Sequence, residues 1–428
     1  MLNPLAQELN DVLSGSIAPE LFSDLGKRIF FPNGIIAQSG EAKKLGKTAN
    51  GTIGMTVIQG HPVTLEVIKK QAPGLSDAEL VAYAPTAGNV ELREIWKEKL
   101  IKKNPSLKNK KFSLPVLVPG LTAGISYIAD LFLNEEDTLI AADPSWDNYS
   151  LICETRRGAT LRMFKLFNEN GFNMEEFEKT INEEAEKGFI HVILNFPQNP
   201  SGYSPTVEEA EKICSILKAQ AEKGTKILAI SDDAYFGLNY EDNINPESLF
   251  AKTADLHKNI LAVKIDGPTK EDFVWGFRSG FLTFANPQMT EEQYTALITK
   301  LMGIIRSSVS CSSTPGQSML LKAIKDPAID EQKLELRKVL EERYRIVRDF
   351  VNTHKCSILT ALPFNSGYFM SFNVKDNKSE ELRVKLLNKY GIGTVSIDSK
   401  TLRVAFSSIE KDKLVSVYET IYKAAEEL

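Results

Sequence analysis

The stretch from Phe189 to Ile230 reads FIHVILNFPQNPSGYSPTVEEAEKICSILKAQAEKGTKILAI. Its two apolar runs, Phe189–Leu194 and Ile227–Ile230, are nearly continuous, as in strands that are buried on both faces of a sheet. Between them, Thr206 and Glu209 form a capping box, and apolar residues then recur at helical spacing. A strand, a helix and a second strand in this order indicate part of a parallel sheet.

The same alternation continues on both sides of this stretch. Further apolar runs predict strands at Pro115–Pro119, Thr138–Ala142 and Ile260–Ile265, with amphipathic stretches between them. Repeated units of strand and helix imply an α/β fold in which a mostly parallel sheet is sandwiched by helices. We assign this large domain to residues 63–330 and expect it to bind the cofactor or ligand.

The C-terminal part of the chain has a different pattern. Tyr368–Val374 and Leu402–Phe406 are predicted strands, and Asp330–Arg348 is predicted to form a long solvated helix that leads into them. The last segment carries apolar residues on one helical face, as a closing helix does. We therefore expect a smaller α+β domain from the two chain ends. Residues 331–428 form its body, and residues 1–62 form an N-terminal arm and part of the same domain.

Composition limits the classes of protein and partner. The chain has 428 residues and is 43% hydrophobic, which suits two domains around a large core. Its net charge of −5 argues against a nucleic-acid partner, and no apolar run approaches the roughly 20 residues of a membrane span. The N-terminus lacks the features of a signal peptide, so we expect a cytoplasmic protein with reduced cysteines. The four cysteines and four histidines lack metal-ligand spacing, so no metal site is predicted.

Two nucleotide-binding motifs are excluded. Gly40 and Gly46-Lys47-Thr48 have five residues between the glycines, whereas a phosphate loop requires four. This segment is therefore interpreted as a polar loop. No GxGxxG run opens a helix after a strand, which removes the main support for a nicotinamide dehydrogenase.

A lysine motif follows the run Ile260–Ile265, where residues 266–281 read DGPTKEDFVWGFRSGF. Lys270 is followed by Gly276 after six positions and by Arg278 after eight, whereas Lys264, inside the strand, has no such sequel. The motif resembles the cofactor-lysine signature of class I and II aminotransferases, which are fold-type I enzymes that depend on pyridoxal phosphate. The resemblance implies that Lys270 holds pyridoxal 5'-phosphate as a Schiff base and that Arg278 binds its phosphate.

Two motifs upstream extend the resemblance. The motif SDDAY, which ends at Tyr235, matches the family's D-x-x-Y element, whose spacing selects Asp232 over Asp233. In the family this aspartate keeps the pyridine nitrogen of the cofactor protonated, and the protonated ring accepts the charge of a carbanion. The motif NFPQNPSG, which contains Asn199, resembles the NPxNPTG run. The resemblance implies that Asn199 and Tyr235 donate hydrogen bonds to the phenolic oxygen of the cofactor, and that Asn199 also borders the substrate.

Further residues complete the implied cofactor site. In VPGLTAGIS, the backbone N–H groups of Leu121 and Thr122 lie at a predicted helix start, whose positive end favours a phosphate. The resemblance places Trp146, in the motif DPSWDNY, on the face of the pyridine ring. The chain departs from the family at Gly267, where many members have a phosphate-binding serine. Thr269 or Thr122 is expected to substitute for that serine.

Four residues are implied in substrate binding and assembly. The motif TLRVAF resembles the strand whose arginine binds the α-carboxylate of the substrate, which gives Arg403. The motif NGTIGM resembles the segment that closes over this carboxylate, which gives Gly54. Tyr83, in YAPTAG, resembles a tyrosine that reaches the phosphate in the neighbouring subunit, which implies a homodimer with shared active sites. Arg306 resembles an arginine that binds the distal carboxylate of acidic substrates, although an arginine that stabilises the end of its helix is the alternative.

The resemblance runs from about residue 50 to residue 406 and implies a pyridoxal-phosphate-dependent aminotransferase. Such an enzyme moves an amino group from an L-amino acid to a 2-oxo acid by a ping-pong mechanism. Lys270 is the implied acid and base, with Asp232 and Tyr235 as the other catalytic residues. A β-lyase or decarboxylase with the same fold is the alternative. A catalytically silent regulator is disfavoured because Lys270, Asp232 and Arg403 are all present.

Overall fold

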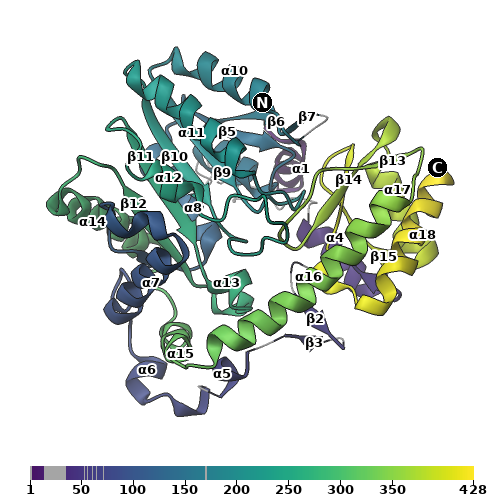
Figure 1. Ribbon diagram of the computed structural model, residues 1–428, viewed down its shortest axis with the longest axis horizontal. Helices are drawn as coiled ribbons and strands as arrows, with labels where there is room; N and C mark the ends of the chain where they lie inside the picture. The colour runs from purple at the N-terminus through teal and green to yellow at the C-terminus, as the bar shows by residue number, and fades with distance from the viewer. Residues whose placement is uncertain are drawn as a thin grey trace.

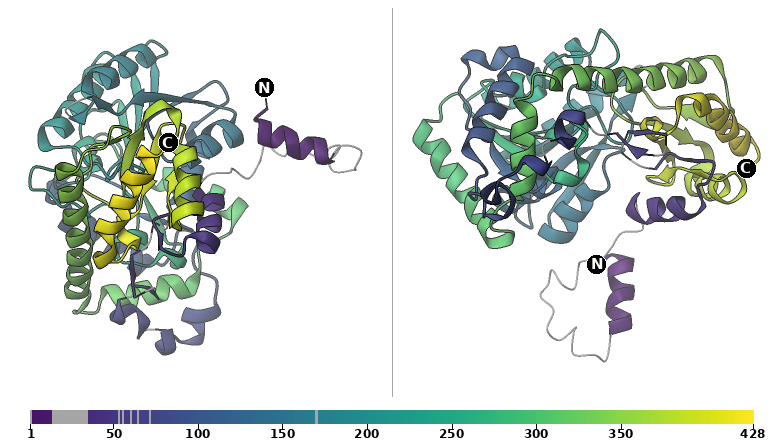
Figure 2. Two further views of the ribbon diagram at one scale, coloured as in Figure 1. Left: turned by 90° about the vertical axis from the view of Figure 1, so that its right-hand side faces the viewer. Right: turned by 90° about the horizontal axis from the view of Figure 1, so that it is seen from below.

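The computed structural model describes residues 2–13 and 35–428, apart from residues 53, 55, 60, 64, 71, 169 and 170. In this part of the chain, a seven-stranded sheet carries helices on both faces (Figure 1). The long helix α16 (Ile329–Thr353) begins beside α15 (Thr314–Ile324) and runs to a smaller domain that contains the C-terminus (Figure 1 and Figure 2). The predicted fold class, a large sheet domain with a smaller α+β domain, is confirmed.

The large sheet has the strand order β4-β12-β11-β10-β9-β5-β6. The five strands from β11 to β6 run parallel, and β12 is antiparallel to both of its neighbours. All five strands predicted from apolar runs are present, whereas β6 and β12 were not predicted. The strand bounds are Val116–Val118 (β4), Thr138–Asp143 (β5), Thr160–Lys165 (β6), Phe189–Asn195 (β9), Lys226–Asp232 (β10), Ile260–Asp266 (β11) and Gly280–Ala285 (β12).

In the large domain, α8, α10, α11 and α12 pack against this sheet, α14 packs on α8, and α15 packs on α7 (Figure 1). The helix α11 starts at the predicted capping box, in which Thr206 and Glu209 bond each other's backbone. The bounds of these helices are Val90–Lys103 (α7), Leu121–Phe132 (α8), Met174–Ala185 (α10), Val207–Glu222 (α11), Leu249–Thr253 (α12), Glu291–Ser308 (α14) and Thr314–Ile324 (α15).

Alternate residues of the central strands point to opposite faces of the sheet. On β10, Leu228 and Ile230 pack in the core that contains α8 and α14, whereas Ile227 and Ala229 pack with α10 and α11. Asp232 lies two residues beyond Ile230, so the period of two directs it to the α8 face. Asp233, the next residue along the chain, is directed to the other face.

The smaller domain combines the two ends of the chain. Its four-stranded sheet has the order β13-β14-β17-β16, and the short strand β1 near the N-terminus pairs with β15 in the same region. The exact division of the chain at residues 62 and 330 stays a prediction. The bounds are Ile35–Leu45 (α4), Ala49–Asn50 (β1), Leu359–Ala361 (β13), Met370–Val374 (β14), Ser379–Tyr390 (α17), Ile392–Gly393 (β15), Val395–Ser396 (β16), Thr401–Val404 (β17) and Leu414–Glu426 (α18).

The remaining elements are short, apart from the ten-residue helix α1. None of the helices in the described ranges is long and apolar enough to cross a membrane. The cytoplasmic location stays a prediction. The remaining bounds are Pro4–Leu13 (α1), Val57–Ile58 (β2), His61–Pro62 (β3), Glu66–Lys69 (α5), Asp77–Val81 (α6), Asn148–Ser150 (α9), Phe167–Asn168 (β7), Gly171–Phe172 (β8) and Pro268–Glu271 (α13).

Candidate active site

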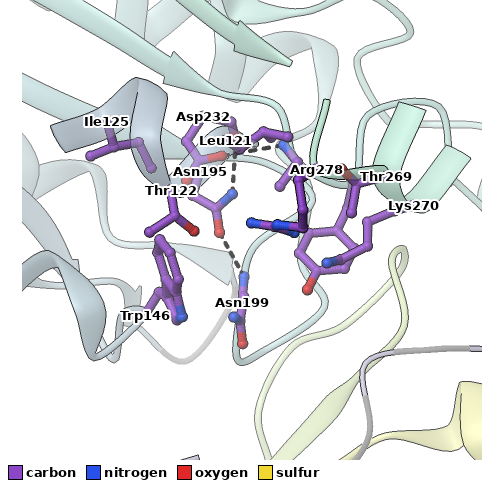
Figure 3. Close-up of a pocket in the computed structure, with 12 residues that line it drawn as sticks. Leu121, Thr122, Ile125, Trp146, Asn195, Asn199, Asp232, Thr269, Lys270 and Arg278 are labelled. Carbon is purple, nitrogen blue, oxygen red and sulfur yellow. Dashed lines mark hydrogen bonds between the residues drawn. The ribbon is translucent and has the colours of Figure 1, made fainter. Parts of the chain in front are cut away.

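A cavity opens at the carboxyl edge of the large sheet, where β9, β10 and β11 end beside the first turn of α8 (Figure 3). Open α/β sheets bind ligands at this edge. Nine of the ten residues predicted to bind the cofactor line the cavity, and Tyr83 is the exception. The lining residues are Leu121, Thr122, Ile125, Trp146, Asn195, Asn199, Asp232, Ala234, Tyr235, Thr269, Lys270 and Arg278.

Lys270 lies on the short helix α13, directly after β11. Its Nζ is 5.2 Å from the centroid of the Tyr235 ring. Burial lowers the pKa of Lys270 to about 8; the positive charges of Arg278 and Arg403 add to this effect, and the negative charge of Asp232 opposes it. A fraction of the Lys270 amine is therefore uncharged at neutral pH, as a nucleophilic amine requires.

Asp232 ends β10 and is buried. The hydroxyl of Tyr149 donates a hydrogen bond to Asp232 Oδ2 over 2.5 Å, and the backbone N–H of Ala234 donates to Asp232 Oδ1 over 3.2 Å. Burial raises the pKa of Asp232 to about 6, while the hydrogen bond from Tyr149 acts in the opposite direction. Asp232 is therefore mostly ionised at neutral pH and presents a carboxylate to the cavity.

Tyr149 was not predicted as a site residue. It belongs to the motif DPSWDNY, three residues after Trp146, and lies on α9. Its partner Asp232 is 83 residues further along the chain, so no local pattern reveals the contact. The one available signal is a tyrosine three positions after the predicted ring-stacking tryptophan.

A compact cradle is formed by Arg278, Gly120 and the first turn of α8. A Cβ atom at Gly120, where φ is 94°, would lie 2.5 Å from Arg278 Nη2, and one at Gly280 would lie 2.9 Å from the carbonyl carbon of Gly120. Only glycine permits such an approach. The N–H groups of Leu121 and Thr122 are in the first turn of α8 and have no partner within the helix. These donors and the Arg278 guanidinium suit a phosphate dianion.

The packing around Gly267 explains the missing serine. A Cβ atom at Gly267 would lie 2.8 Å from the carbonyl oxygen of Ser279 and 3.0 Å from Leu121 Cδ1, so a serine side chain does not fit there. Both residues expected to replace the serine, Thr269 and Thr122, line the cavity. The hydroxyl of Thr269 donates a long hydrogen bond of 3.4 Å to Ser279.

Arg403 lies on β17 of the smaller domain and is 2% exposed. Its Nη1 donates to Asn199 Oδ1 over 2.9 Å, and its Nη2 donates to the carbonyl oxygen of Thr52 over 3.1 Å. Burial lowers the pKa of Arg403 to about 10. Its Nε is buried and has no hydrogen-bond partner among the described residues. A buried guanidinium with an unused donor suits an anionic ligand.

Gly54 lies close to this arginine site. A Cβ atom at Gly54 would lie 3.3 Å from the ring of Phe369 and 3.9 Å from the hydroxyl of Tyr235. The ring of Phe369 in turn lies 4.2 Å from the centre of the Arg403 guanidinium. The structure thus brings Gly54, Tyr235 and Arg403 together, although Ile53 and Met55 of the same motif lie outside the described residues.

Three residues considered in the sequence analysis lie away from the cavity. Tyr83 is 93% exposed, and Arg306, in the last turn of α14, is also exposed. Neither residue borders the cavity. Lys264 is fully buried and forms an ion pair with Asp233, so it does not border the cavity either. In the described residues, no group of histidine, cysteine and acidic side chains has the geometry of a metal site.

Comparison with known proteins identifies the family. The model of the family described as "Aminotransferase class I and II" matches residues 55–421, which is most of the chain. The chain belongs to this family. The predicted resemblance is therefore confirmed, and the protein is an enzyme, a pyridoxal-phosphate-dependent aminotransferase that acts on amino acids and 2-oxo acids.

Several curated relatives of this aminotransferase cover most of its length. A "Probable aspartate/prephenate aminotransferase" of Aquifex aeolicus is 27% identical over 73% of this chain and 74% of its own. An "Aspartate aminotransferase" of Sulfurisphaera tokodaii is 23% identical over 82% of this chain and 84% of its own. Their names agree with the transaminase prediction, and nothing in these comparisons favours a lyase or a decarboxylase.

Solved structures share the fold of this aminotransferase. An aminotransferase from Anaerococcus prevotii has a TM-score of 0.83 and 23% identity, and covers 94% of this chain and 99% of its own. A Pyrococcus horikoshii kynurenine aminotransferase, solved with PMP and with KYN and KYA as substrates and products, has a TM-score of 0.77 and 18% identity, and covers 97% of this chain and 99% of its own. At this identity the likeness supports the fold alone.

Proposed function

We propose that this aminotransferase holds pyridoxal phosphate as a Schiff base on Lys270, with Asp232 paired to the ring nitrogen. The observation that carries the proposal is that one cavity contains an enclosed lysine amine, a buried carboxylate and an anion cradle. Trp146 borders the same cavity and supplies a flat face for an aromatic ring. Asn199 and Tyr235 would donate hydrogen bonds to the phenolic oxygen of the cofactor.

The phosphate would occupy the cradle of Arg278 and the first turn of α8. Arg278 supplies a fixed positive charge, and the N–H groups of Leu121 and Thr122 supply two donors at the positive end of a helix. Thr269 lines the cavity beside Lys270, and we propose that its hydroxyl exchanges its long bond to Ser279 for the phosphate and thus replaces the missing serine. This arrangement leaves the reactive end of the cofactor near Lys270.

The substrate carboxylate would bind Arg403. Two nitrogens of the guanidinium, the unused Nε among them, offer a carboxylate the two parallel hydrogen bonds that suit this geometry. Gly54 and Asn199 would close the remaining sides of this site. Burial strengthens the ion pair because few water molecules screen it.

Lys270 would act as the base and the acid that transfer the substrate proton. Bound pyridoxal phosphate supplies a ring that withdraws the electrons left at the substrate Cα when a proton departs. Released as a free amine, Lys270 Nζ would take the proton from Cα and deliver it to the cofactor carbon that carries the Schiff base, since its lowered pKa lies close to the working pH. Asp232 stays ionised and holds the positive charge on the ring nitrogen through this transfer.

A half-reaction tests this function and separates it from the alternatives. Mixing the enzyme with an L-amino acid and no 2-oxo acid is expected to convert the lysine-bound cofactor fully to pyridoxamine phosphate, with one equivalent of 2-oxo acid released. Absorbance and mass spectrometry of the released cofactor measure this conversion. A β-lyase would release ammonia, a decarboxylase would release carbon dioxide, and a silent regulator would bind without turnover. Any of these outcomes contradicts the proposal.

We also propose a homodimer in which each subunit contributes to both sites. Leu80, Val81 and Tyr83 are large apolar or aromatic side chains with exposed fractions of 49%, 77% and 93%. This segment is fixed by a hydrogen bond of 2.6 Å from the hydroxyl of Thr314 to the carbonyl oxygen of Ala82. An exposed apolar segment that is hydrogen-bonded to the start of α15 fits burial against a second copy of the chain.

Hybrid dimers test the role of Tyr83. Tyr83→Phe is expected to weaken pyridoxal phosphate binding about 10-fold, the effect of losing one hydrogen bond to a charged group. A hybrid of one Tyr83→Phe subunit with one Lys270→Ala subunit should recover one site of normal affinity, because the intact lysine receives its tyrosine from the other subunit. Equilibrium dialysis of the purified hybrid measures this. A hybrid that keeps the weak affinity, or a fully active monomer, contradicts the proposal.

We propose that the amino donor is aspartate or glutamate. Its distal carboxylate would bind Arg306 of the neighbouring subunit. Several relatives are named aspartate aminotransferases, and the exposed position of Arg306 leaves its charge available at a dimer surface. Arg306→Ala is expected to raise the KM for both acidic donors about 10-fold or more and to leave the KM for alanine unchanged. Lys300→Ala, an exposed cation on the same helix, is the matched control. Equal losses on glutamate and alanine would make Arg306 structural.

A further inference from the structure

A buried ionic cluster lies behind the cavity, on the opposite face of the sheet from α8. We define the Lys264 cluster as Lys264, Asp233 and Asp266. Lys264 is 0% exposed; its Nζ contacts Asp233 Oδ2 and lies 3.7 Å from Asp266 Oδ2. The period of two along β11 directs Lys264 and Asp266 to one face and Val263 and Ile265 to the α8 face.

The two carboxylates of the Lys264 cluster are also held by neighbouring helices. Trp96 Nε1, on α7, donates to Asp266 Oδ1 over 3.2 Å. The hydroxyl of Ser248, which caps α12, donates to Asp233 Oδ2 over 2.5 Å. Each carboxylate therefore has a neutral donor on one side and shares Lys264 on the other. A single cation between two buried carboxylates fixes their separation.

The cluster joins the two strand ends that carry the residues of the proposed cofactor site. Asp233 directly follows Asp232, and its N–H donates to the carbonyl oxygen of Ile265 over 2.8 Å. Asp266 ends β11 and is followed by Gly267, Pro268, Thr269 and then Lys270. A shift of either carboxylate would therefore move Asp232 or Lys270 through a few backbone bonds.

We propose that Lys264 is a positioning residue, whose contacts with Asp233 and Asp266 set the distance between Asp232 and Lys270 across the cofactor ring. This inference rests on the proposed function of those two residues. The two carboxylates outweigh the effect of burial and raise the pKa of Lys264, so the cation persists at any pH at which the enzyme is folded and active. Lys264 touches neither cofactor nor substrate, since it lies on the other face of the sheet.

Lys264→Met, studied in the holoenzyme, tests the inference. The substitution keeps the length of the side chain and removes its charge. We expect kcat to fall about 10²-fold, as happens when reacting groups are displaced by about 1 Å. The KM for the amino acid should change less than about 3-fold, because the Arg403 site is on another domain and stays intact. Lys226→Met, at the exposed start of the neighbouring strand β10, should change neither value.

Two further measurements separate positioning from general stability. Both are made below the unfolding temperature of each variant. The first is the rate of deuterium exchange at the substrate Cα, per mole of bound cofactor. The second is the wavelength of maximum absorption of the lysine-bound cofactor. A variant that unfolds at lower temperature but keeps both values refutes the inference. If Lys264→Met fails to fold, Lys264→Arg replaces it, because arginine keeps the positive charge but has a different shape. The inference then requires that the exchange rate and the absorption maximum both change in Lys264→Arg.

Failure of this inference is distinguishable from failure of the proposed function. Borohydride reduction of the unmodified enzyme, followed by peptide mapping, locates the cofactor. If the adduct is absent from Lys270, the proposed function itself is wrong. If the adduct is on Lys270 and Lys264→Met retains the kcat and the exchange rate of the unmodified enzyme, only the positioning role is wrong.

Discussion

Lys270→Ala is expected to abolish the visible absorbance of lysine-bound pyridoxal phosphate and to lower turnover by roughly 10⁴-fold, the upper range for one acid-base residue. The variant loses both the amine that attaches the cofactor and the amine that moves the proton at Cα. Absorbance spectra, borohydride reduction and steady-state rates measure the two losses. The cradle around Arg278 is untouched, so phosphate-dependent binding of the cofactor should persist.

Lys270→Arg is the matched variant because it keeps a positive charge without a nucleophilic amine. We expect the same loss of absorbance and turnover as in Lys270→Ala. A borohydride-stable adduct in either variant would mean that another lysine carries the cofactor. Lys264 was the nearest candidate along the chain, but its ion pair with Asp233 holds it on the other face of the sheet.

Attachment of the cofactor should also depend on pH in a defined direction. The pKa of Lys270 is lowered from 10.5 to about 8, so its uncharged fraction rises through pH 8 and not through pH 10.5. The rate at which cofactor-free enzyme captures pyridoxal phosphate should therefore increase up to about pH 8 and then level off. A profile that continues to rise to pH 10 would contradict the burial of this amine.

Asp232→Ala is expected to leave pyridoxal phosphate bound but to lower the rate of Cα proton removal by about 10²- to 10³-fold, the usual effect of losing one preorganised electrostatic contact. The carboxylate is the only described acidic group that lines the cavity, so nothing else there stabilises a charged ring nitrogen. Stopped-flow measurement of the half-reaction, with a deuterated donor to isolate the proton step, provides the rate.

Two companion variants sharpen this test. Tyr149→Phe removes the hydrogen bond to Asp232 Oδ2 and keeps the carboxylate, so we expect a loss of about 10-fold, equivalent to one hydrogen bond to a charged group. Asp233→Asn should lower thermal stability, because it removes a partner of Lys264. A larger loss of proton-transfer rate in Asp233→Asn than in Asp232→Asn would mean that Asp233, and not Asp232, is the partner of the ring nitrogen.

The sequence predicts the fold through the burial of its central strands. β9, β10 and β11 are buried on both faces, so their apolar runs stand out without any alternation. The strand β6 was missed because it lies at the sheet edge and is largely exposed or half-buried. The strand β12 was missed because it begins inside the lysine motif, at Gly280, and its glycine start does not resemble a strand.

The candidate site could be predicted where its residues belong to local motifs. Lys270, Arg278 and Asp232 were chosen by their spacing to neighbours, and all three line one cavity. Tyr149 and the Lys264 cluster could not be found in this way, because their contacts join residues that are 83 and 31 positions apart. Such contacts depend on which strands are adjacent and which face each residue occupies. The spacing of residues along the chain does not show which strands are adjacent or which face a residue occupies.

The bond between Arg403 and the carbonyl oxygen of Thr52 has a consequence for synthesis on the ribosome, since these residues are 351 positions apart. Domains generally form as the chain emerges, N-terminal parts first. The residues around Lys270 and Arg278 emerge more than a hundred positions before Arg403. The carboxylate site, in contrast, requires Thr52 to wait for Arg403. A nascent chain therefore gains the residues for its coenzyme before it can recognise an amino acid.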